Sequence, residues 1–429
     1  MTRIDGERLL ADLRQLATFG ATPEGGVSRP SFSPADLAAR AWLAERAAEA
    51  GLGYREDAVG NIFLRLEATD PVDDRTVWTG SHLDSVPNGG PLDGALGVMT
   101  SLEAVRALAE SGLPLQRSVE AVAFTDEEGA YGGFLGSKAA VIGFDHAALR
   151  SMRGREGDLL VETMAAAGYA PERIAEARVD AARVAAYLEV HIEQGAVLEE
   201  VGARVGVVTD IVGVLRGEVL FTGRPDHAGT TPMGLRRDAV RGLASMLDGI
   251  EGLPAAVGEP TAVVTCGRIE VAPGADNIVP GRAVAHFDVR HRDLEVILRL
   301  EERIEERARR AAAAHDLEVA YRRETVTEPV PLDAGLQERI AAAADALGIA
   351  RHVMPSGAGH DAQVVAPAIP TGMIFVPSID GRSHSPLERS RDEDVVAGAE
   401  VLLHVLTGLV TDTRPDDAEA VRRSEGAAR

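Results

Sequence analysis

The sequence contains a single cysteine, Cys266, among 429 residues. One cysteine cannot form a disulfide within the chain or supply a cysteine cluster for a metal ion, so imidazole and carboxylate remain as the strong ligands. Aromatic residues make up only 4% of the chain, but apolar residues make up 45% and supply an ample core. Because a chain of this length exceeds what one core usually organises, we expect about two domains.

The chain also lacks an excess of positive charge and long apolar runs. Its formal net charge of -23 at pH 7 repels nucleic acid phosphates and anionic lipid, so neither is an expected partner. The start, MTRIDGERLLADLRQL, has no apolar segment typical of a signal peptide, and no stretch approaches the ~20 apolar residues of a membrane span. We therefore expect a cytoplasmic protein.

Common catalytic and nucleotide-binding motifs are missing as well. The sequence has no GxSxG elbow, no Walker loop and no CxxC pair. The stretch from Gly357 to Ala362 fits GxGxxA, but it lies late in the chain and does not open a βαβ unit. We interpret it as a turn that closes over a site.

The first third of the chain alternates helix and strand signals. Ser33 followed by Pro34 predicts the start of a helix that ends at Gly51. Apolar runs predict strands at residues 61–66, 77–81, 119–125 and 184–190, and helical spacing predicts a helix at 95–109. This order predicts an α/β layer with a largely parallel sheet, whose ligands lie at the carboxyl ends of strands.

The order changes between residues 211 and 327. We expect strands at 212–222, 262–270, 283–290 and 317–327, and helices at 238–250 and 294–315. This is the split βαβ arrangement of a ferredoxin-like α+β domain, inserted into a domain formed by residues 1–210 and 328–429. The alternation then resumes with a helix at 336–347, a strand at 372–376 and a helix from Asp394. The tail from Asp412 is expected to be a frayed end.

Two segments in the first half combine imidazole and carboxylate. In GSHLDSVPNGGPLDG, His82 and Asp84 point the same way from a strand end, and glycines flank Asp93, so the segment suits an ion such as Zn²⁺. Asp84 is placed to accept the far N–H of His82. In FTDEEG, adjacent Glu127 and Glu128 can diverge, one binding metal and the other acting as a general base on the attacking water. Alone, each segment also fits an ordinary polar loop.

Further polar residues follow predicted strands or lie in small polar loops. HIEQG contains His191 at a strand end, and GRSHSP contains His384. In the inserted domain, His227 of RPDHAGTTPM could donate a hydrogen bond to an oxyanion. Asn277 of DNIVPG adds a donor, and Arg290 of DVR adds a cation that can grip a carboxylate through two hydrogen bonds. Each of these residues alone is typical of a structural or surface position.

Taken in order, these segments, with SGAGHDA and SHSPLE, resemble the amidase/hydantoinase/carbamoylase branch of the zinc aminoacylase and carboxypeptidase superfamily. This branch includes N-carbamoyl-L-amino acid hydrolases, allantoate amidohydrolases and β-ureidopropionases. The resemblance extends from about Gly25 to Leu402. It implies a mixed-sheet, metallopeptidase-like α/β catalytic domain with an inserted lid and dimerisation domain.

The resemblance also implies a site with two divalent metal ions. Asp93 bridges the ions, His82 and His191 complete one, and Glu128 and His384 complete the other. Glu127 is the base that activates the water. We expect Zn²⁺, with Mn²⁺, Co²⁺ or Ni²⁺ as alternatives, because ligands of this kind accept all four.

The matching substrate positions are Gln194, His227, Asn277, Arg290, Gly357 and His360. The resemblance implies a homodimer formed by the inserted domain, and it leaves open whether His227 and Asn277 serve the same subunit or its partner. The chain departs from the family in the segment AYGGFLGSK, in RPDH, and in Asp380 and Arg382 of SIDGRSHS. These departures leave the ligands in place and bear on substrate preference.

The expected reaction is therefore hydrolysis of a ureido or amide C–N bond in a small carboxylate substrate, such as an N-carbamoyl-L-amino acid. The nearest alternatives are an allantoate amidohydrolase and a β-ureidopropionase, followed by an aminoacylase or dipeptidase. A non-catalytic binding module with the same fold is a rival from another class, which the complete ligand set and Glu127 argue against.

Overall fold

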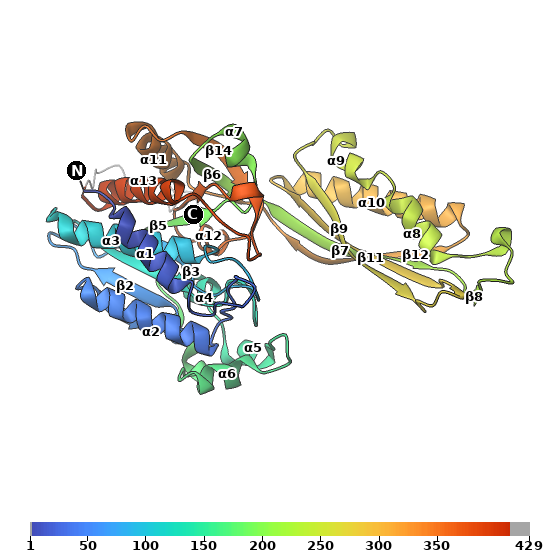
Figure 1. Cartoon of the computed structure of the whole chain (residues 1–429), viewed down its shortest axis with the longest axis horizontal. Coiled ribbons are helices and arrows are strands. Elements are labelled where there is room, and N and C mark those ends of the chain that lie inside the picture. The colour runs from blue at the N-terminus through green and yellow to red at the C-terminus, as the bar shows by residue number, and fades with distance from the viewer. Residues whose placement is uncertain (1, 412–429) are drawn as a thin grey trace, which may run out of the picture. The chain divides into compact units, whose positions relative to one another are not determined.

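The computed structural model describes residues 2–411, so the frayed end predicted from Asp412 lies outside the described residues. The chain divides into two compact units (Figure 1). The larger unit comprises Met1–Thr209 and Pro331–Arg429, and the inserted unit comprises Asp210–Val330.

The larger unit is built on a nine-stranded mixed sheet. Its order is β1-β2-β4-β3-β5-β15-β6-β13, with β14 also paired to β6. The neighbours β4, β3, β5 and β15 run parallel, while β1, β2 and β6 pair antiparallel. The mixed sheet confirms the predicted α/β fold class, although only its centre is parallel. The strands are β1 (Gly53–Glu56), β2 (Ile62–Leu66), β3 (Thr76–His82), β4 (Ser118–Phe124), β5 (Val184–Ile192), β6 (Val205–Ile211), β13 (Val330–Pro331), β14 (Arg351–Ser356) and β15 (Thr371–Val376).

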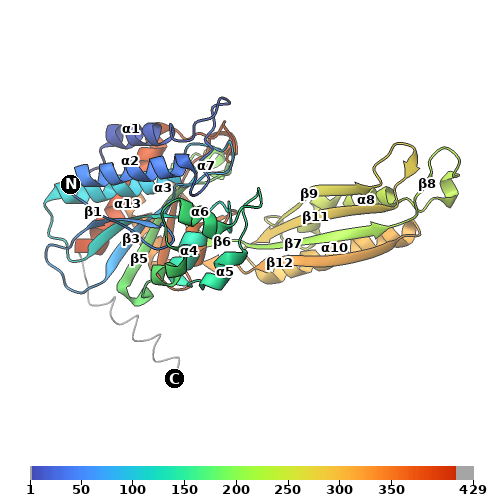
Figure 2. The same ribbon diagram turned by 90° about the horizontal axis from the view of Figure 1, so that it is seen from below.

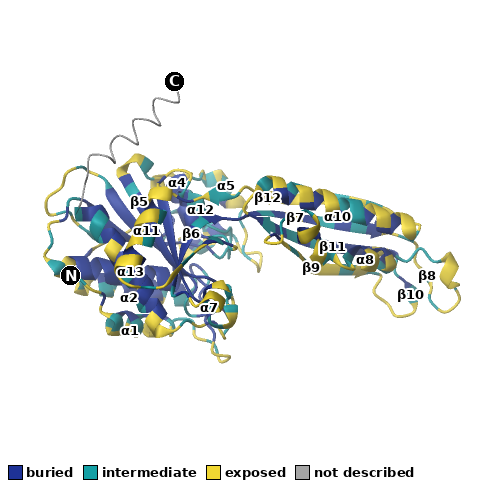
Figure 3. Cartoon of the chain, turned by 90° about the horizontal axis from the view of Figure 1, so that it is seen from above, coloured by how far each residue is buried: buried dark blue, intermediate teal, exposed yellow. Residues whose placement is uncertain are grey.

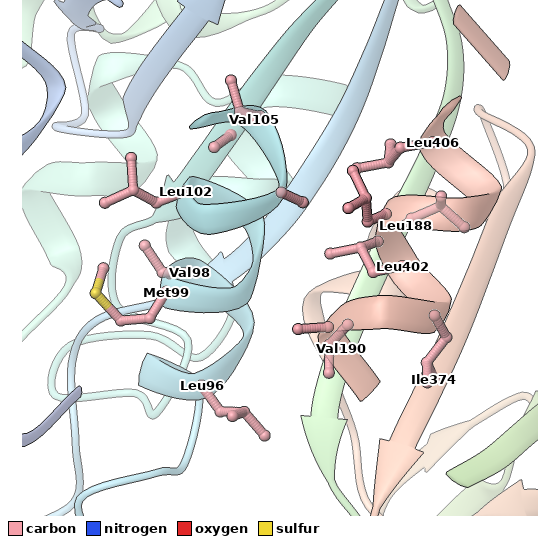
Figure 4. Packing of buried hydrophobic residues seen from close by; sticks show 14 of the residues in the cluster. Leu96, Val98, Met99, Leu102, Val105, Leu188, Val190, Ile374, Leu402 and Leu406 are labelled. Atoms are coloured by element: carbon pink, nitrogen blue, oxygen red, sulfur yellow. The ribbon is translucent and has the colours of Figure 1, made fainter. Parts of the chain in front are cut away.

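Two long helices form the core over the centre of this sheet. In Figure 4, α3 and α13 lie side by side, and Leu402 and Leu406 of α13 lie between them with Leu188 and Val190 of β5. Met99 and Leu102 of α3 point to the other side of that helix. As predicted, α2 begins at Pro34 with the Ser33 side chain as its cap. The helices of this unit are α1 (Gly6–Leu16), α2 (Pro34–Glu49), α3 (Ala95–Ser111), α4 (Leu135–Val141), α5 (His146–Ser151), α6 (Leu160–Ala166), α7 (Val197–Val201), α11 (Ala334–Ala346), α12 (Asp361–Val365) and α13 (Asp392–Thr411).

Helix α13 corrects the expectation that no stretch is apolar enough to span a membrane. Among the described residues it is the one helix whose length and composition pass that test. However, 67% of its most apolar window is buried, and Leu402 and Leu406 point into the core (Figure 4). Its apolar character is therefore accounted for by packing.

The inserted unit has the order of elements that the sequence predicts. Its antiparallel sheet runs β12-β7-β11-β9, and α8 and α10 cover one face, while much of β9 is exposed (Figures 2 and 3). A short ribbon pairs β8 with β10. The elements are β7 (Gly213–Thr222), β8 (Asp226–His227), α8 (Ala239–Leu247), α9 (Leu253–Ala256), β9 (Val263–Ala272), β10 (Ile278–Val279), β11 (Arg282–His291), α10 (Leu294–Ala314) and β12 (Glu318–Thr327).

A buried ion pair in α2 yields a stability prediction. Arg40 Nε lies 2.8 Å from Asp36 Oδ2, and both side chains are at most 4% exposed. Arg40→Ala should lower the free energy of unfolding by about 3–5 kcal/mol, because it leaves the Asp36 carboxylate buried without its cation. The exposed pair Arg14 and Asp392 is the control, and Arg14→Ala should cost at most about 1 kcal/mol. Equal losses in urea titrations of the two variants would contradict this account.

Candidate metal centre

The carboxyl ends of three adjacent parallel strands bring the first candidate residues together. His82 is the last residue of β3 and pairs in register with Phe124, the last residue of β4. On the other side of β3 lies β5, which carries His191 as its penultimate residue. Since parallel strands end at one edge of the sheet, side chains over a hundred residues apart in the sequence meet there.

Asp93 enters the site from the loop before α3. Its Oδ1 lies 3.2 Å from His191 Nε2 and 3.9 Å from His82 Nε2, and its Oδ2 lies 3.1 Å from His384 Nε2. Gly94 follows with a φ of 64°, and a Cβ built on it would lie 2.3 Å from the His82 ring. Only glycine therefore allows the chain to turn this close to the imidazole.

The turn after β4 separates three consecutive carboxylates. Asp126 points back and accepts the backbone N–H groups of Ala130, Tyr131 and Gly132 at 2.7–3.0 Å. Glu127 Oε2 lies 3.7 Å from His82 Nε2, and Glu128 Oε1 lies 3.5 Å from His384 Nε2. The two adjacent glutamates thus lie beside different imidazoles, and their division into ligand and base stays a prediction.

Asp84 has a wider role than the sequence predicts. The Nδ1 of His82 lies 3.0 Å from the Asp84 backbone carbonyl and 3.6 Å from its carboxylate. The carboxylate instead accepts the backbone N–H groups of Glu127 and Glu128 at 3.3 and 3.1 Å. Asp84 therefore holds the His82 ring through its carbonyl and the glutamate turn through its side chain.

His384 and Gln194 lie on the open side of the site. The His384 side chain is 53% exposed, whereas His82 and His191 are almost fully buried. Gln194 Nε2 donates to Asp93 Oδ2 at 3.0 Å and to Ser383 Oγ at 3.2 Å. Both His384 and Gln194 have a positive φ, which turns their side chains inward from irregular loops.

These residues form two ligand groups that share Asp93. One group consists of His82, Asp93 and His191, and the other of Asp93, Glu128 and His384. Within each group the potential ligand atoms lie within 4.8 Å of one another. Such an array of imidazole and carboxylate suits divalent ions of the first transition row.

The charges of the site favour cation binding. Burial raises the pKa of Glu127 well above its ordinary value, and burial together with the nearby Asp93 raises the pKa of Glu128 to about 7. Burial works in the same direction on Asp93, but the imidazoles of His191 and His384 hold its pKa well below the usual range. The buried Oε1 of Glu128 also has no hydrogen-bond donor among the described residues. A divalent ion would satisfy this oxygen and stabilise the charged carboxylates.

His360 and Gly357 lie in the loop between β14 and α12. The His360 ring is buried, stacks edge-on against His191 with centroids 4.4 Å apart, and places Nε2 2.9 Å from Ser356 Oγ. Burial lowers its pKa well below the ordinary value, so it is neutral at pH 7. Together with Glu189, these two histidines form a further buried group of potential ligand atoms. Gly357 is exposed.

The remaining predicted residues lie in the inserted unit. His227 on β8 pairs in register with Ile278 on β10, which places Asn277 beside it on the ribbon. The Nδ1 of His227 accepts the N–H groups of Gly229 and Thr230 at 3.0 and 3.2 Å. Nε2 is therefore the ring nitrogen left to donate, and the residue is exposed. Arg290 is the penultimate residue of β11, and its Nε donates to Asp288 at 2.6 Å.

Sequence reasoning missed three buried or half-buried residues that support the site. Glu388 and Ser383 contact the Asp93 loop, and Glu189 joins Ser81 to the N–H of Ala362. Their positions within SHSPLE and the strand before HIEQG are visible in the sequence. Nothing in a single sequence distinguishes a buried carboxylate such as Glu388 or Glu189 from a solvated one, or the Ser383 hydroxyl from that of an ordinary loop serine.

The two ligand groups at the edge of the mixed sheet, with a carboxylate beside them, are the arrangement that metal-assisted hydrolysis requires. The model of the peptidase family M20/M25/M40 matches residues 78–408. The chain therefore belongs to this family.

The chain is similar over more than nine-tenths of its length to named amidohydrolases and to solved structures. The chain is 42% identical over 405 residues to the N-carbamoyl-L-amino acid amidohydrolase of Geobacillus stearothermophilus, covering 94% of this chain and 98% of the relative. It is 37% identical over 395 residues to the allantoate amidohydrolase of Escherichia coli, covering 91% and 95%. An amidase of the hydantoinase/carbamoylase family from Burkholderia multivorans superposes with a TM-score of 0.89 at 35% identity, covering 96% of this chain and all of that one.

Proposed function

We propose that this protein hydrolyses the ureido C–N bonds of an N-carbamoyl-L-amino acid. One water is consumed, and the products are carbon dioxide, ammonia and the free amino acid. The observation that carries the proposal is the pair of ligand groups that share Asp93, with Glu127 beside them. The relatives named N-carbamoyl-L-amino acid amidohydrolases support the choice of substrate.

We propose two divalent ions per chain, most readily Zn²⁺, with Mn²⁺, Co²⁺ or Ni²⁺ as alternatives. His82 and His191 would hold one, Glu128 and His384 the other, and Asp93 both. When bound, such ions polarise the substrate carbonyl and acidify the attacking water. The protein supplies the remaining steps through its own side chains.

Glu127 is the proposed base. Its carboxylate lies outside both ligand groups, but it is held 3.7 Å from His82 Nε2 at the edge of the first group. From there it can take the proton of the attacking water and deliver it to the leaving nitrogen. Asp84 fixes the backbone of this turn, so the position of Glu127 does not depend on a flexible loop.

Recognition of the substrate is proposed for polar groups of both units. Gln194 and the loop with Gly357 and His360 belong to the larger unit, and His227, Asn277 and Arg290 to the inserted unit. The Nε2 proton of His227 can stabilise an oxyanion. Arg290 can bind the α-carboxylate of the substrate through two hydrogen bonds.

We further propose a cytoplasmic homodimer joined through the inserted unit. Strand β9 is an edge of its sheet, and Val263, Ile269 and Val271 on it are 39–52% exposed. An apolar sheet edge of this kind favours pairing with a second chain. Light scattering should then give twice the mass of one chain, and His227 and Asn277 could serve either subunit.

Arg290→Ala should raise KM for an N-carbamoyl amino acid by about ten- to a hundredfold, because about 1.5–3 kcal/mol of charge-assisted hydrogen bonding is lost. Arg216 is a matched control, since its Nε also donates to Asp288, at 3.1 Å. Arg216→Ala should leave KM near the wild-type value. An unchanged KM in the Arg290 variant would contradict the assigned role.

Allantoate hydrolysis is the second candidate, favoured by the similarity to the Escherichia coli allantoate amidohydrolase. The deciding experiment is ammonia release from a panel of N-carbamoyl-L-amino acids, allantoate, ureidopropionate and N-acetyl amino acids, with added metal. The proposal predicts the highest kcat/KM on an N-carbamoyl-L-amino acid. Preference for allantoate would replace the proposed substrate but not the chemistry, and a lack of turnover on the whole panel would contradict both.

A further inference from the structure

We infer that Glu388 is a positioning residue that fixes the shared ligand Asp93 and the His384 loop at the same time. This inference rests on the proposed function, because it concerns the geometry of the same metal centre. Glu388 lies four residues after His384 and is only 1% exposed. Among the described residues its carboxylate accepts hydrogen bonds from two backbone N–H groups and one hydroxyl, all of them uncharged.

Glu388 contacts the loop that carries Asp93. Glu388 Oε1 accepts the backbone N–H of Leu92 at 2.9 Å and that of Asp93 at 3.0 Å. These two bonds fix the peptide planes on either side of the Leu92 Cα. The direction in which the Asp93 side chain leaves the backbone is therefore set by Glu388.

Glu388 also contacts the loop that carries His384. Ser383 Oγ lies 2.9 Å from Glu388 Oε2 and 3.2 Å from Asp93 Oδ2. A hydroxyl has one proton, so Ser383 can donate to only one of the two carboxylates at a time. In either arrangement the residue before His384 stays within reach of both, which ties the two ligands of the second group together.

The surrounding backbone is shaped to admit this carboxylate. A Cβ built on Gly90 would lie 2.0 Å from Glu388 Oε1 and 2.1 Å from its carboxyl carbon. Gly90 has no positive φ that would itself demand glycine. The lack of a side chain at position 90 is thus explained by the space that Glu388 occupies.

The test is the affinity of the full-length protein for Zn²⁺, measured by competition with a chromogenic chelator. Glu388→Ala should weaken binding by about 10- to 100-fold, the usual effect of removing a residue that orients a ligand. Gly90→Ala should cause a similar loss, because it displaces the carboxylate without deleting it. Glu388→Gln should retain most of the affinity, since its amide oxygen can accept both N–H groups while its nitrogen donates to Ser383.

Two controls separate positioning from general destabilisation. Glu103 is another buried carboxylate. It accepts hydrogen bonds from the backbone N–H of Asp5 and from the Arg8 guanidinium. Glu103→Ala should lower the thermal midpoint yet keep the affinity for Zn²⁺. Gly408→Ala, in α13 at a site where a Cβ meets nothing within 4 Å, should keep the affinity for Zn²⁺ and should not lower the thermal midpoint, because alanine favours the helix more than glycine does.

The outcomes also separate this inference from the proposed function. Wild-type protein that binds Zn²⁺ tightly, together with Glu388→Ala and Gly90→Ala variants of equal affinity, would overturn the inference alone. Should Glu388→Ala not fold, the Gly90→Ala and Glu388→Gln variants decide the question. Wild-type protein without affinity for divalent ions would overturn the proposed function and the inference with it.

Discussion

Glu127→Gln should lower kcat by about 10²–10⁴-fold while the metal content stays near that of the wild type. Glutamine keeps the size of the side chain, but an NH2 donor replaces one carboxylate oxygen, and the amide cannot take a proton from water at neutral pH. Because Glu127 belongs to neither ligand group, its replacement leaves the imidazole and carboxylate ligands in place. The measurement is steady-state ammonia release, with metal content determined on the same preparation.

The neighbouring glutamate is the matched control for this experiment. Glu128 belongs to the second ligand group, so Glu128→Gln should lower both activity and metal content. The two variants differ by one position in the same turn and make the same chemical change. Normal turnover in the Glu127 variant, or equal loss of metal in both, would contradict the division of roles between base and ligand.

Asp93→Ala should have the largest effect on metal binding. Its carboxylate is the one member common to both ligand groups, with Oδ1 toward His191 and Oδ2 toward His384. Deleting it leaves only two ligands in each group. It also removes the negative charge that lies between the imidazoles. We expect loss of both ions at micromolar free metal and loss of measurable activity.

His384→Ala tests whether the two groups are distinct. His384 is a member of the second group only, so this variant should keep one ion per chain and lose the other. Metal analysis after gel filtration would count the ions. If Asp93→Ala loses no more metal than His384→Ala, Asp93 is not shared.

The elements that carry the site follow from local patterns in the sequence. The predicted helix at residues 95–109 is α3, and the predicted strands at 77–81, 119–125 and 184–190 are β3, β4 and β5, each within about two residues. Alternation of apolar strands with an amphipathic or buried helix is a local property. Once the strands are parallel neighbours, His82 and the turn after β4 must lie at one edge.

Other features depend on contacts that no local pattern encodes. The predicted acceptor of the His82 N–H was the Asp84 carboxylate, but the backbone carbonyl is nearer and the carboxylate holds the glutamate turn. The role of Glu388 depends on a loop nearly 300 residues away. The apolar composition of α13 likewise fits a membrane span or a core helix, and only the helix and strands that bury it show that it is a core helix.

The central claim is that side chains between His82 and His384 converge on divalent ions that the reaction requires. Its most direct test is exhaustive chelation of the wild-type protein followed by metal analysis, activity assay and reconstitution. The account predicts two ions per chain before chelation, no activity after it, and recovery on adding Zn²⁺, Mn²⁺, Co²⁺ or Ni²⁺. Full activity in protein shown to be free of metal would contradict it.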